Sequence, residues 1–164
     1  ADYAPDRIKK INKILVACDC SDFSGQIFSY AVEIGHGLGV ELTVVNVINQ
    51  IELDRISRAL DSFEGKTIED HVTALKEDRK ALIHKLIQDT QKPKLFKKTI
   101  IKIGTHHAEL MNCIEHEKAD LLIIGNKGHG NLAGILMGSC AEKLFRHCPV
   151  TMLMVKVSDQ AQQV

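Results

Sequence analysis

The chain has 164 residues, enough for a single domain that buries a sizeable core. Its 21 lysines and arginines balance 21 aspartates and glutamates, and zero net charge argues against nucleic acid or an anionic membrane surface as the main partner. No apolar run approaches the length of a membrane span. The five cysteines have no framework spacing, which favours reduced thiols in a cytoplasmic protein.

The first part of the chain predicts two strands joined by a helix. Residues 1–11 are polar and predict a flexible lead-in. Residues 13–18 form a compact apolar run that is typical of a central strand, and residues 19–22 form a turn with helix-capping side chains. The helix that follows has apolar residues every three or four positions and a glycine, Gly39, where a helix ends. Residues 41–47, β-branched and apolar, predict the second strand.

The middle of the chain is less regular. Residues 48–66 are compatible with a short helix or a mobile loop. Residues 67–91 predict a long amphipathic helix with one apolar stripe. Residues 96–103 predict a third strand, whose lysines favour a protected edge strand over a phosphate or polyanion patch. The predicted apolar stripe consists of Ile68, Val72, Leu75, Leu82, Ile83 and Leu86.

The last part of the chain continues the alternation of strands and helices. A helix is predicted over residues 104–118, a fourth strand over 120–124, and a last helix that runs to about residue 147. Residues 150–157 predict a fifth strand, and residues 158–164 form a polar tail. Strands that alternate with helices predict a parallel sheet with helices on both faces.

A glycine-rich loop follows the fourth predicted strand. Gly125 ends the apolar run, Gly128 follows after two residues, and Gly138-Ser139 comes nine residues later at the start of the last helix. Glycines let a backbone approach a phosphate closely, and the N–H groups of a helix N-terminus point at the anion. The stretch therefore predicts a phosphate-binding loop.

Other interpretations of this loop are weaker or remain open. The P-loop motif is excluded, because no Gly-Lys-Ser or Gly-Lys-Thr occurs. Gly128, Gly130 and Gly134 nearly match the dinucleotide fingerprint, but that fingerprint belongs in the first strand-to-helix turn of a fold. A purely structural loop stays open, because Ser139 and Glu142 fit a capping box.

Asp19 offers a second half for the same site. It directly follows the first predicted strand, and ligands of doubly wound sheets sit beyond the carboxyl ends of strands where the strand order reverses. If the first and fourth strands are neighbours, Asp19 and Gly125 flank one crevice. The carboxylate would accept hydrogen bonds from a ribose or an adenine amino group; the alternative is a turn residue that caps the helix.

Other groups of reactive side chains in the sequence give little evidence of a functional site. Cys18 and Cys20 alternate across a strand end, so we expect their thiols to point apart and not to bind a metal together. His106-His107 has no spaced partner ligands and fits the first turn of a helix. No Ser/His/Asp order and no G-x-S-x-G elbow supports hydrolysis by a nucleophile.

With these residues in view, the chain resembles a universal stress protein domain. The resemblance rests on KILVACDCSDFS at the first strand, LTVVNV at the second, and DLLIIGNKGHG…MGS followed by PVTMLMVK. The resemblance covers residues 12–157, which would form one domain. The spacing of the glycines is similar to that of the family's ATP-binding subgroup.

The resemblance implies a five-stranded parallel sheet of order 3-2-1-4-5 with helices on both faces, similar to adenine nucleotide α-hydrolase and Rossmann folds. It also implies binding of ATP, ADP or AMP with Mg²⁺ at the phosphates, and a homodimer formed through the last strand. The implied binding residues are Ala17, Asp19, Val47, Ile124, Gly125, Lys127, Gly128, Gly138, Ser139 and Cys140.

Departures from the family pattern do not remove a ligand group. Cys20 stands where glycine is common, and His129 and Asn131 stand where small or hydroxyl residues are usual.

Three functions remain open for the protein. The first is a nucleotide-dependent regulatory or interaction module. The second is a slow ATPase or self-phosphorylating enzyme that uses Ser139, Lys127 or His129, and the third is a partner-binding module that needs no nucleotide.

Overall fold

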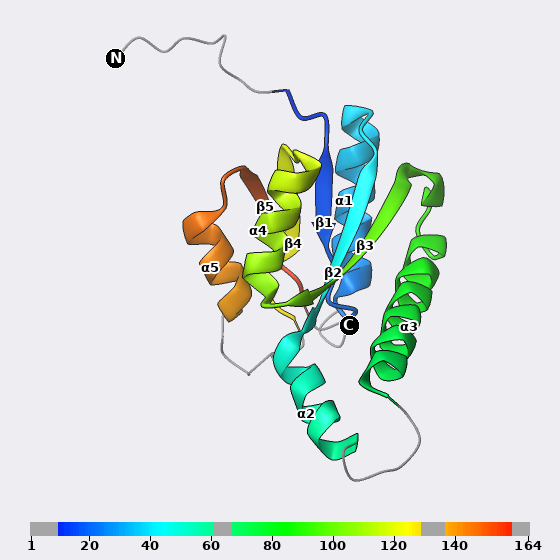
Figure 1. Ribbon diagram of the computed structural model, residues 1–164. Helices are drawn as coiled ribbons and strands as arrows, with labels where there is room; N and C mark the ends of the chain where they lie inside the picture. Colours follow the sequence, from blue (N-terminus) through cyan, green and yellow to red (C-terminus); the bar gives the residue numbers. More distant parts are fainter. Residues whose placement is uncertain (1–9, 61–66, 129–136, 159–164) are drawn as a thin grey trace.

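The protein is a five-stranded parallel β-sheet with helices on both faces, in a computed structural model that describes residues 10–60, 67–128 and 137–158 (Figure 1). The strand order is β3-β2-β1-β4-β5, which confirms the predicted fold class and order. The strands are β1 (Ile14–Ala17), β2 (Leu42–Asn49), β3 (Phe96–Gly104), β4 (Leu121–Gly125) and β5 (Thr151–Val155). The helices are α1 (Ser24–Leu38), α2 (Gln50–Leu60), α3 (Ile68–Gln88), α4 (His106–Glu117) and α5 (Ser139–His147), with a 3₁₀ turn, η2, at Pro93–Leu95.

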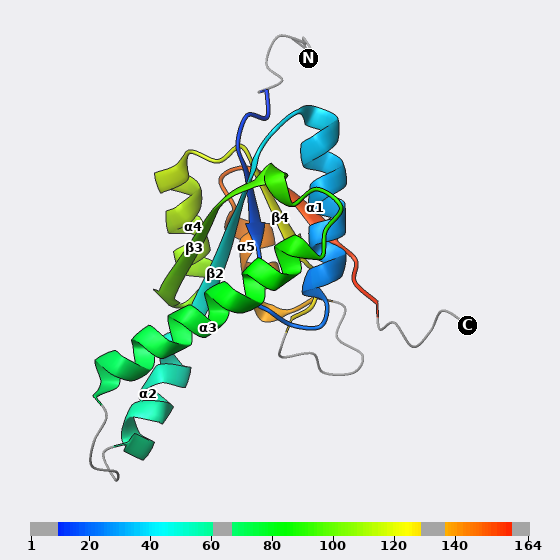
Figure 2. The ribbon, with the colours of Figure 1, turned by 90° about the vertical axis from the view of Figure 1, so that its right-hand side faces the viewer.

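Two apolar layers hold the sheet between its helices. Helices α1 and α3 cover one face, and α4 and α5 cover the other (Figures 1 and 2). All residues of β1 and β4 are buried, because the two central strands are covered on both faces, as their unbroken apolar runs require. The register aligns Ile14 with Leu42 on one side and with Leu121 on the other, so the carboxyl ends of the strands meet at one edge.

The predicted elements form with shifted ends. Gly39 ends α1 with φ 65°, as predicted from the glycine. The ambiguous stretch contains a helix, α2, while residues 61–66 lie outside the described ranges. Helix α3 begins after Thr67, which forms a capping box with Asp70. The predicted position of β3 at an edge of the sheet is confirmed.

The apolar stripe predicted for α3 is partly wrong. Ile83 and Ile87 are buried, but Ile68 and Leu82 are each 49% exposed. Two causes apply. The N-terminal part of α3, which carries Ile68, projects with α2 beyond the sheet (Figure 2). In the C-terminal part, which packs on the sheet through Ile83 and Ile87, Leu82 lies on another side of the helix. The predicted lead-in and tail lie almost entirely outside the described residues. Within the described ranges, no helix is long and apolar enough to cross a membrane.

Candidate functional site

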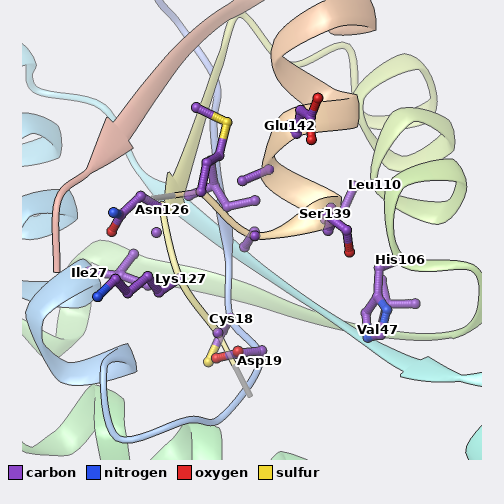
Figure 3. A pocket seen from close by; sticks show the side chains of 18 of the residues that line it. Cys18, Asp19, Ile27, Val47, His106, Leu110, Asn126, Lys127, Ser139 and Glu142 are labelled. Carbon is purple, nitrogen blue, oxygen red and sulfur yellow. The ribbon is translucent and has the colours of Figure 1, made fainter. Parts of the chain in front are cut away.

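A pocket of about 630 Å³ opens at the carboxyl edge of the sheet. It lies where β1 and β4 meet, which is the point at which the strand order reverses, and the N-termini of α4 and α5 flank it (Figure 3). Its volume is within the range of about 300–1,000 Å³ that small-molecule sites occupy. The position is the one that parallel α/β folds use for ligands.

All ten residues predicted for the site line this one pocket. They come from β1, β2, β4, the loop after β4 and the start of α5, segments that lie far apart in the chain. The structure thus brings the ten residues together, and their roles toward a ligand remain predictions. The pocket wall also contains residues that were not predicted, among them His106, Leu110, Asn126, Met137 and Glu142.

One end of the pocket is apolar. Ala17, Val47 and Ile124 are at most 8% exposed and contribute from three neighbouring strands. Leu110, buried on α4, and His106, the first residue of α4, line the same pocket (Figure 3). Apolar walls with polar groups nearby suit the ring system of a nucleobase.

Asp19 is held in one orientation. Its Oδ1 accepts hydrogen bonds from the Ser21 N–H at 3.0 Å and from the buried Ser24 hydroxyl at 3.4 Å. The capping role is wrong: the residue before the first turn of α1 is Phe23, and no side chain caps that helix. Asp19 instead stabilises the turn after β1 and keeps its second oxygen, Oδ2, against Gly128.

Two of the loop glycines lie so close to other side chains that a β-carbon would force a neighbour to move. A β-carbon at position 125 would lie 2.7 Å from Ile27 Cδ1, and one at position 128 would collide with Asp19 Oδ2. Gly138 differs, because the nearest atom to a β-carbon there, the Asn126 carbonyl oxygen, would be 3.7 Å away. Among the described residues there is therefore room above Gly138, which is consistent with a ligand that approaches the backbone at this point.

Helix α5 points its N-terminus into the pocket. Its first residue is Ser139, and the N–H groups of Ser139, Cys140 and Ala141 cannot pair within the helix. Such donors and the dipole of a helix favour a nearby anion. The Gly138 N–H is engaged by the Asn126 carbonyl at 2.8 Å, so the amide donors for an anion come from α5 itself.

The capping box predicted from Ser139 and Glu142 does not form. The residue before the first turn of α5 is Gly138, and no side chain caps the helix. Ser139 is the first helical residue, and a capping side chain would have to come from the residue before it. Its exposed side chain lies in the pocket wall (Figure 3), so the hydroxyl faces the site.

Asn126 ties the loop to its surroundings. Its buried side-chain oxygen accepts the Val157 N–H at 2.9 Å, and its own N–H donates to the Val155 carbonyl at 3.0 Å. Together with the bond from Gly138, these contacts join the end of β4, the end of β5 and the start of α5. The α5 N-terminus is thereby fixed relative to the sheet.

The pocket wall contains side chains of both charges. Lys127 supplies a cation to the wall, and Glu142 supplies an anion on α5. Burial raises the pKa of the Cys140 thiol to about 11, and the negative charge of Asp19 adds to the rise while Lys143 opposes it. Cys140 is therefore a neutral thiol at physiological pH and contributes no charge to repel a phosphate.

Two predictions on discounted residues have different outcomes. His106-His107 forms the first turn of α4, as predicted. The sequence did not predict that His106 lines the pocket. It does so because a sheet of order 3-2-1-4-5 brings the junction of β3 and α4 to the carboxyl edge, where ligands bind. The thiols of Cys18 and Cys20 were predicted to point apart, and this is wrong: their sulfurs are 4.0 Å apart. His129 and Asn131 lie outside the described residues.

The fold and the pocket define a doubly wound α/β protein with a pocket at the carboxyl edge of its sheet, flanked by the N-terminus of α5. A model described as the universal stress protein family matches residues 10–156. This match shows that the chain belongs to the universal stress protein family, as the sequence resemblance predicted.

Curated relatives carry the same family name. The universal stress protein Sll1388 of Synechocystis is 22% identical over 151 residues, which cover 88% of this chain and 97% of the relative. The universal stress protein MJ0577 of Methanocaldococcus jannaschii is 26% identical over 129 residues, which cover 71% of this chain and 76% of the relative.

Solved structures share the fold. The structure of MJ0577 has a TM-score of 0.76 at 23% identity and covers 93% of this chain and 100% of that one. A universal stress protein in complex with cAMP has a TM-score of 0.60 at 19% identity, with coverage of 92% and 100%. A universal stress protein of Archaeoglobus fulgidus in complex with dAMP has a TM-score of 0.53 at 16% identity, with coverage of 90% and 100%.

Proposed function

We propose that this protein binds an adenine nucleotide, ATP or the related ADP or AMP, in the pocket between Asp19 and the N-terminus of α5. Binding would make it a nucleotide-dependent regulatory or interaction module in a cellular stress response. The observation that carries the proposal is that one pocket combines apolar walls, a carboxylate and a helix N-terminus with room above Gly138.

Each part of a nucleotide has a matching part of the pocket. The base fits the apolar walls formed by Val47, Ile124 and Leu110. Asp19 Oδ2 is the acceptor for a ribose hydroxyl or for the adenine amino group. The phosphates fit the first turn of α5, where the N–H groups of Ser139, Cys140 and Ala141 converge. Lys127 in the wall adds a positive charge.

Relatives support an adenine ligand. Two universal stress proteins of the same fold were solved with cAMP and with dAMP. The spacing of Gly125, Gly128 and Gly138-Ser139 is similar to that of the family's ATP-binding subgroup. Together these points favour an adenine nucleotide over other phosphate compounds.

Mg²⁺ fits this site only together with the phosphates. The described residues contain no group of three or more histidine, cysteine or acidic side chains that would hold a metal by themselves. Mg²⁺ is commonly held by one or two carboxylates and by substrate phosphates. Asp19 and Glu142 are the carboxylates among the described residues that line the pocket, so we expect a metal ion to depend on one of them and on the phosphates, and a chelator to weaken ATP binding.

The test uses the whole protein, purified without added nucleotide. A mass spectrum of the small molecules that it releases should contain an adenine nucleotide. Calorimetry with ATP, ADP and AMP should then rank their affinities, and a ligand at 100 times its dissociation constant should stabilise the fold by about 2.7 kcal/mol. Absence of both co-purified nucleotide and titratable binding would overturn the proposal. Steady phosphate release from ATP that a Lys127→Ala variant abolishes would instead favour the slow ATPase.

The proposal extends to assembly. β5 is an edge strand, and Met152, Leu153 and Met154 are only partly buried. An edge strand with apolar side chains pairs readily with another strand. We infer a homodimer in which the β5 strands of two copies lie together.

A further inference from the structure

Two cysteine thiols face each other beside the pocket. Cys18 directly follows β1 and is 3% exposed, whereas Cys20 is partly exposed. Their sulfurs are 4.0 Å apart, and both are free thiols. A disulfide needs an S–S distance of about 2.05 Å, so rotation of the side chains and a small shift of the turn would close the remaining gap.

The backbone at Cys20 explains this arrangement. Cys20 has φ 60°, a left-handed conformation that a residue other than glycine rarely adopts. The turn folds the Cys20 side chain back over Cys18 instead of continuing the alternation of a strand. The buried Asn46 side chain supports the turn, because its Nδ2 donates to the Cys18 carbonyl at 2.8 Å and lies 3.9 Å from Cys20 Sγ.

The surroundings give the two thiols different roles. A hydrogen bond from the Cys18 thiol and the guanidinium of Arg79 on α3 lower the pKa of Cys20 to about 7, although burial and the charge of Asp19 oppose the shift. The hydrogen bond to Cys20, burial and the charge of Cys20 raise the pKa of Cys18. Cys20 is thus the thiolate nucleophile, and Cys18 is the buried thiol next to it.

We propose that Cys18 and Cys20 form a peroxide-reactive pair that closes to an intramolecular disulfide. The Cys20 thiolate attacks one oxygen of hydrogen peroxide; an S–O bond forms, the O–O bond breaks, and the leaving hydroxide takes a proton to become water. The Cys18 sulfur then attacks Cys20 Sγ; the S–S bond forms, the S–O bond breaks, and a second water leaves with the Cys18 proton. Two thiols lose two electrons, and one peroxide becomes two waters.

The disulfide would reach the pocket through Asp19, the residue between the two cysteines. The Arg79 guanidinium on α3 also lies 3.5 Å from the Asp19 carbonyl oxygen, so this cation contacts the turn that carries both thiols and the pocket carboxylate. Drawing the two sulfurs together moves the Asp19 backbone and with it the carboxylate that lies against Gly128. This consequence rests on the proposed nucleotide function, whereas the disulfide does not.

The experiment treats the reduced whole protein with hydrogen peroxide, blocks remaining thiols and digests with trypsin. Cleavage after Lys13 and Arg55 gives one peptide that contains Cys18 and Cys20, no other cysteine and no methionine. That peptide should escape blocking, lose the mass of two hydrogens, and return to the blocked form after treatment with dithiothreitol. If both thiols remain open to blocking after peroxide, or if Cys113, Cys140 or Cys148 oxidises first, the proposal is overturned.

Variants separate the two roles. Cys18→Ala should leave Cys20 as a sulfenic acid that dimedone traps, and Cys20→Ser should abolish both the adduct and the disulfide. Arg79→Gln should slow the oxidation several-fold, while Lys80→Gln, an exposed cation one position along α3, should not. A dimedone adduct on Cys18 in the Cys20→Ser variant, or equal rates for the two α3 variants, would contradict the assignment.

A last measurement compares the nucleotide affinities of the reduced and the oxidised protein. We expect at least tenfold weaker binding after the disulfide closes, with recovery on reduction. If the disulfide forms and the reduced protein binds no nucleotide, the proposed function fails and the thiol pair stands. If both forms bind equally well, only the coupling through Asp19 fails.

Discussion

The carboxylate of Asp19 lies directly against the Cα of Gly128, so that no side chain fits at position 128 without moving Asp19. The two residues lie more than a hundred positions apart and come from the ends of two adjacent strands, β1 and β4. Their contact joins the nucleoside half of the proposed site to the glycine loop. A change at Gly128 should therefore be felt at Asp19.

Gly128→Ala should weaken adenine nucleotide binding by about tenfold or more, because the new methyl group displaces the Asp19 carboxylate and narrows the pocket. Calorimetric titration with ATP measures the effect. Gly37→Ala is the matched control, since a β-carbon at that position of α1 meets nothing within 4 Å. Equal affinities for the two variants would show that the loop does not approach the ligand.

Asp19→Ala should weaken nucleotide binding by about 1.5–3 kcal/mol, the contribution of a hydrogen bond to a charged group. Asp22→Ala is the control, because Asp22 is exposed and does not line the pocket. The partner of Asp19 follows from analogues in the wild type. Selective loss of affinity for a deoxyribose nucleotide identifies a ribose hydroxyl, and selective loss for an inosine nucleotide identifies the adenine amino group. An Asp19→Ala variant that binds as tightly as the wild type would refute either role.

The reactivity of Cys20 should depend on pH in a defined direction. Its pKa is lowered from 9.0 to about 7, chiefly by the hydrogen bond from Cys18 and then by Arg79. The thiolate is therefore already formed above pH 7, and it is lost as the pH falls through that value. Alkylation of the tryptic peptide that contains Cys20 should reach half of its maximal rate near pH 7. Cys18→Ala should move the midpoint upward, and a midpoint near 9 in the wild type would contradict the shift.

Much of the site could be predicted from the sequence, because its signals are local. Asp19 directly ends an apolar strand, and Gly125, Gly128 and Gly138 have a fixed spacing before a helix. Strand–helix alternation predicts a parallel sheet, and parallel strands bring their carboxyl ends to one edge. The strand order itself came from the family resemblance, since alternation alone does not choose among the possible orders.

The failures come from features that depend on the folded surroundings. The left-handed turn at Cys20 is unusual for a residue with a side chain, so the rule of alternation along a strand put its thiol on the wrong side. Helix α5 begins at Ser139, one residue earlier than a capping box by Ser139 needs. His106 reaches the pocket only because β3 and α4 meet at the same edge as β1 and β4.

Helix α3 allows a direct test of its corrected packing face. Ile83 is fully buried and Leu82 is 49% exposed, although the two are neighbours in the chain. Ile83→Ala should cost about 2–5 kcal/mol of unfolding free energy, because it leaves a cavity against the sheet. Leu82→Ala should change the unfolding free energy by no more than about 0.5 kcal/mol. Urea denaturation measures both, and equal losses would restore the stripe predicted from the sequence.

The β5 edge leads to a test of assembly. Met154 is partly exposed on this edge strand, and its β5 neighbours have the apolar character that a strand-to-strand interface requires. Met154→Lys places a charge where two copies would meet, and the lysine would lose its hydration if the interface formed. Sedimentation of the wild type should therefore give a dimer, and sedimentation of Met154→Lys a monomer with unchanged secondary structure by circular dichroism. Leu82→Lys is the control, because it introduces the same charge at an exposed apolar position of α3, away from the edge strand. This variant should remain dimeric.

A wild-type protein that is monomeric at its highest soluble concentration would exclude the β5 dimer. A Leu82→Lys variant that dissociates while Met154→Lys does not would move the interface to α3.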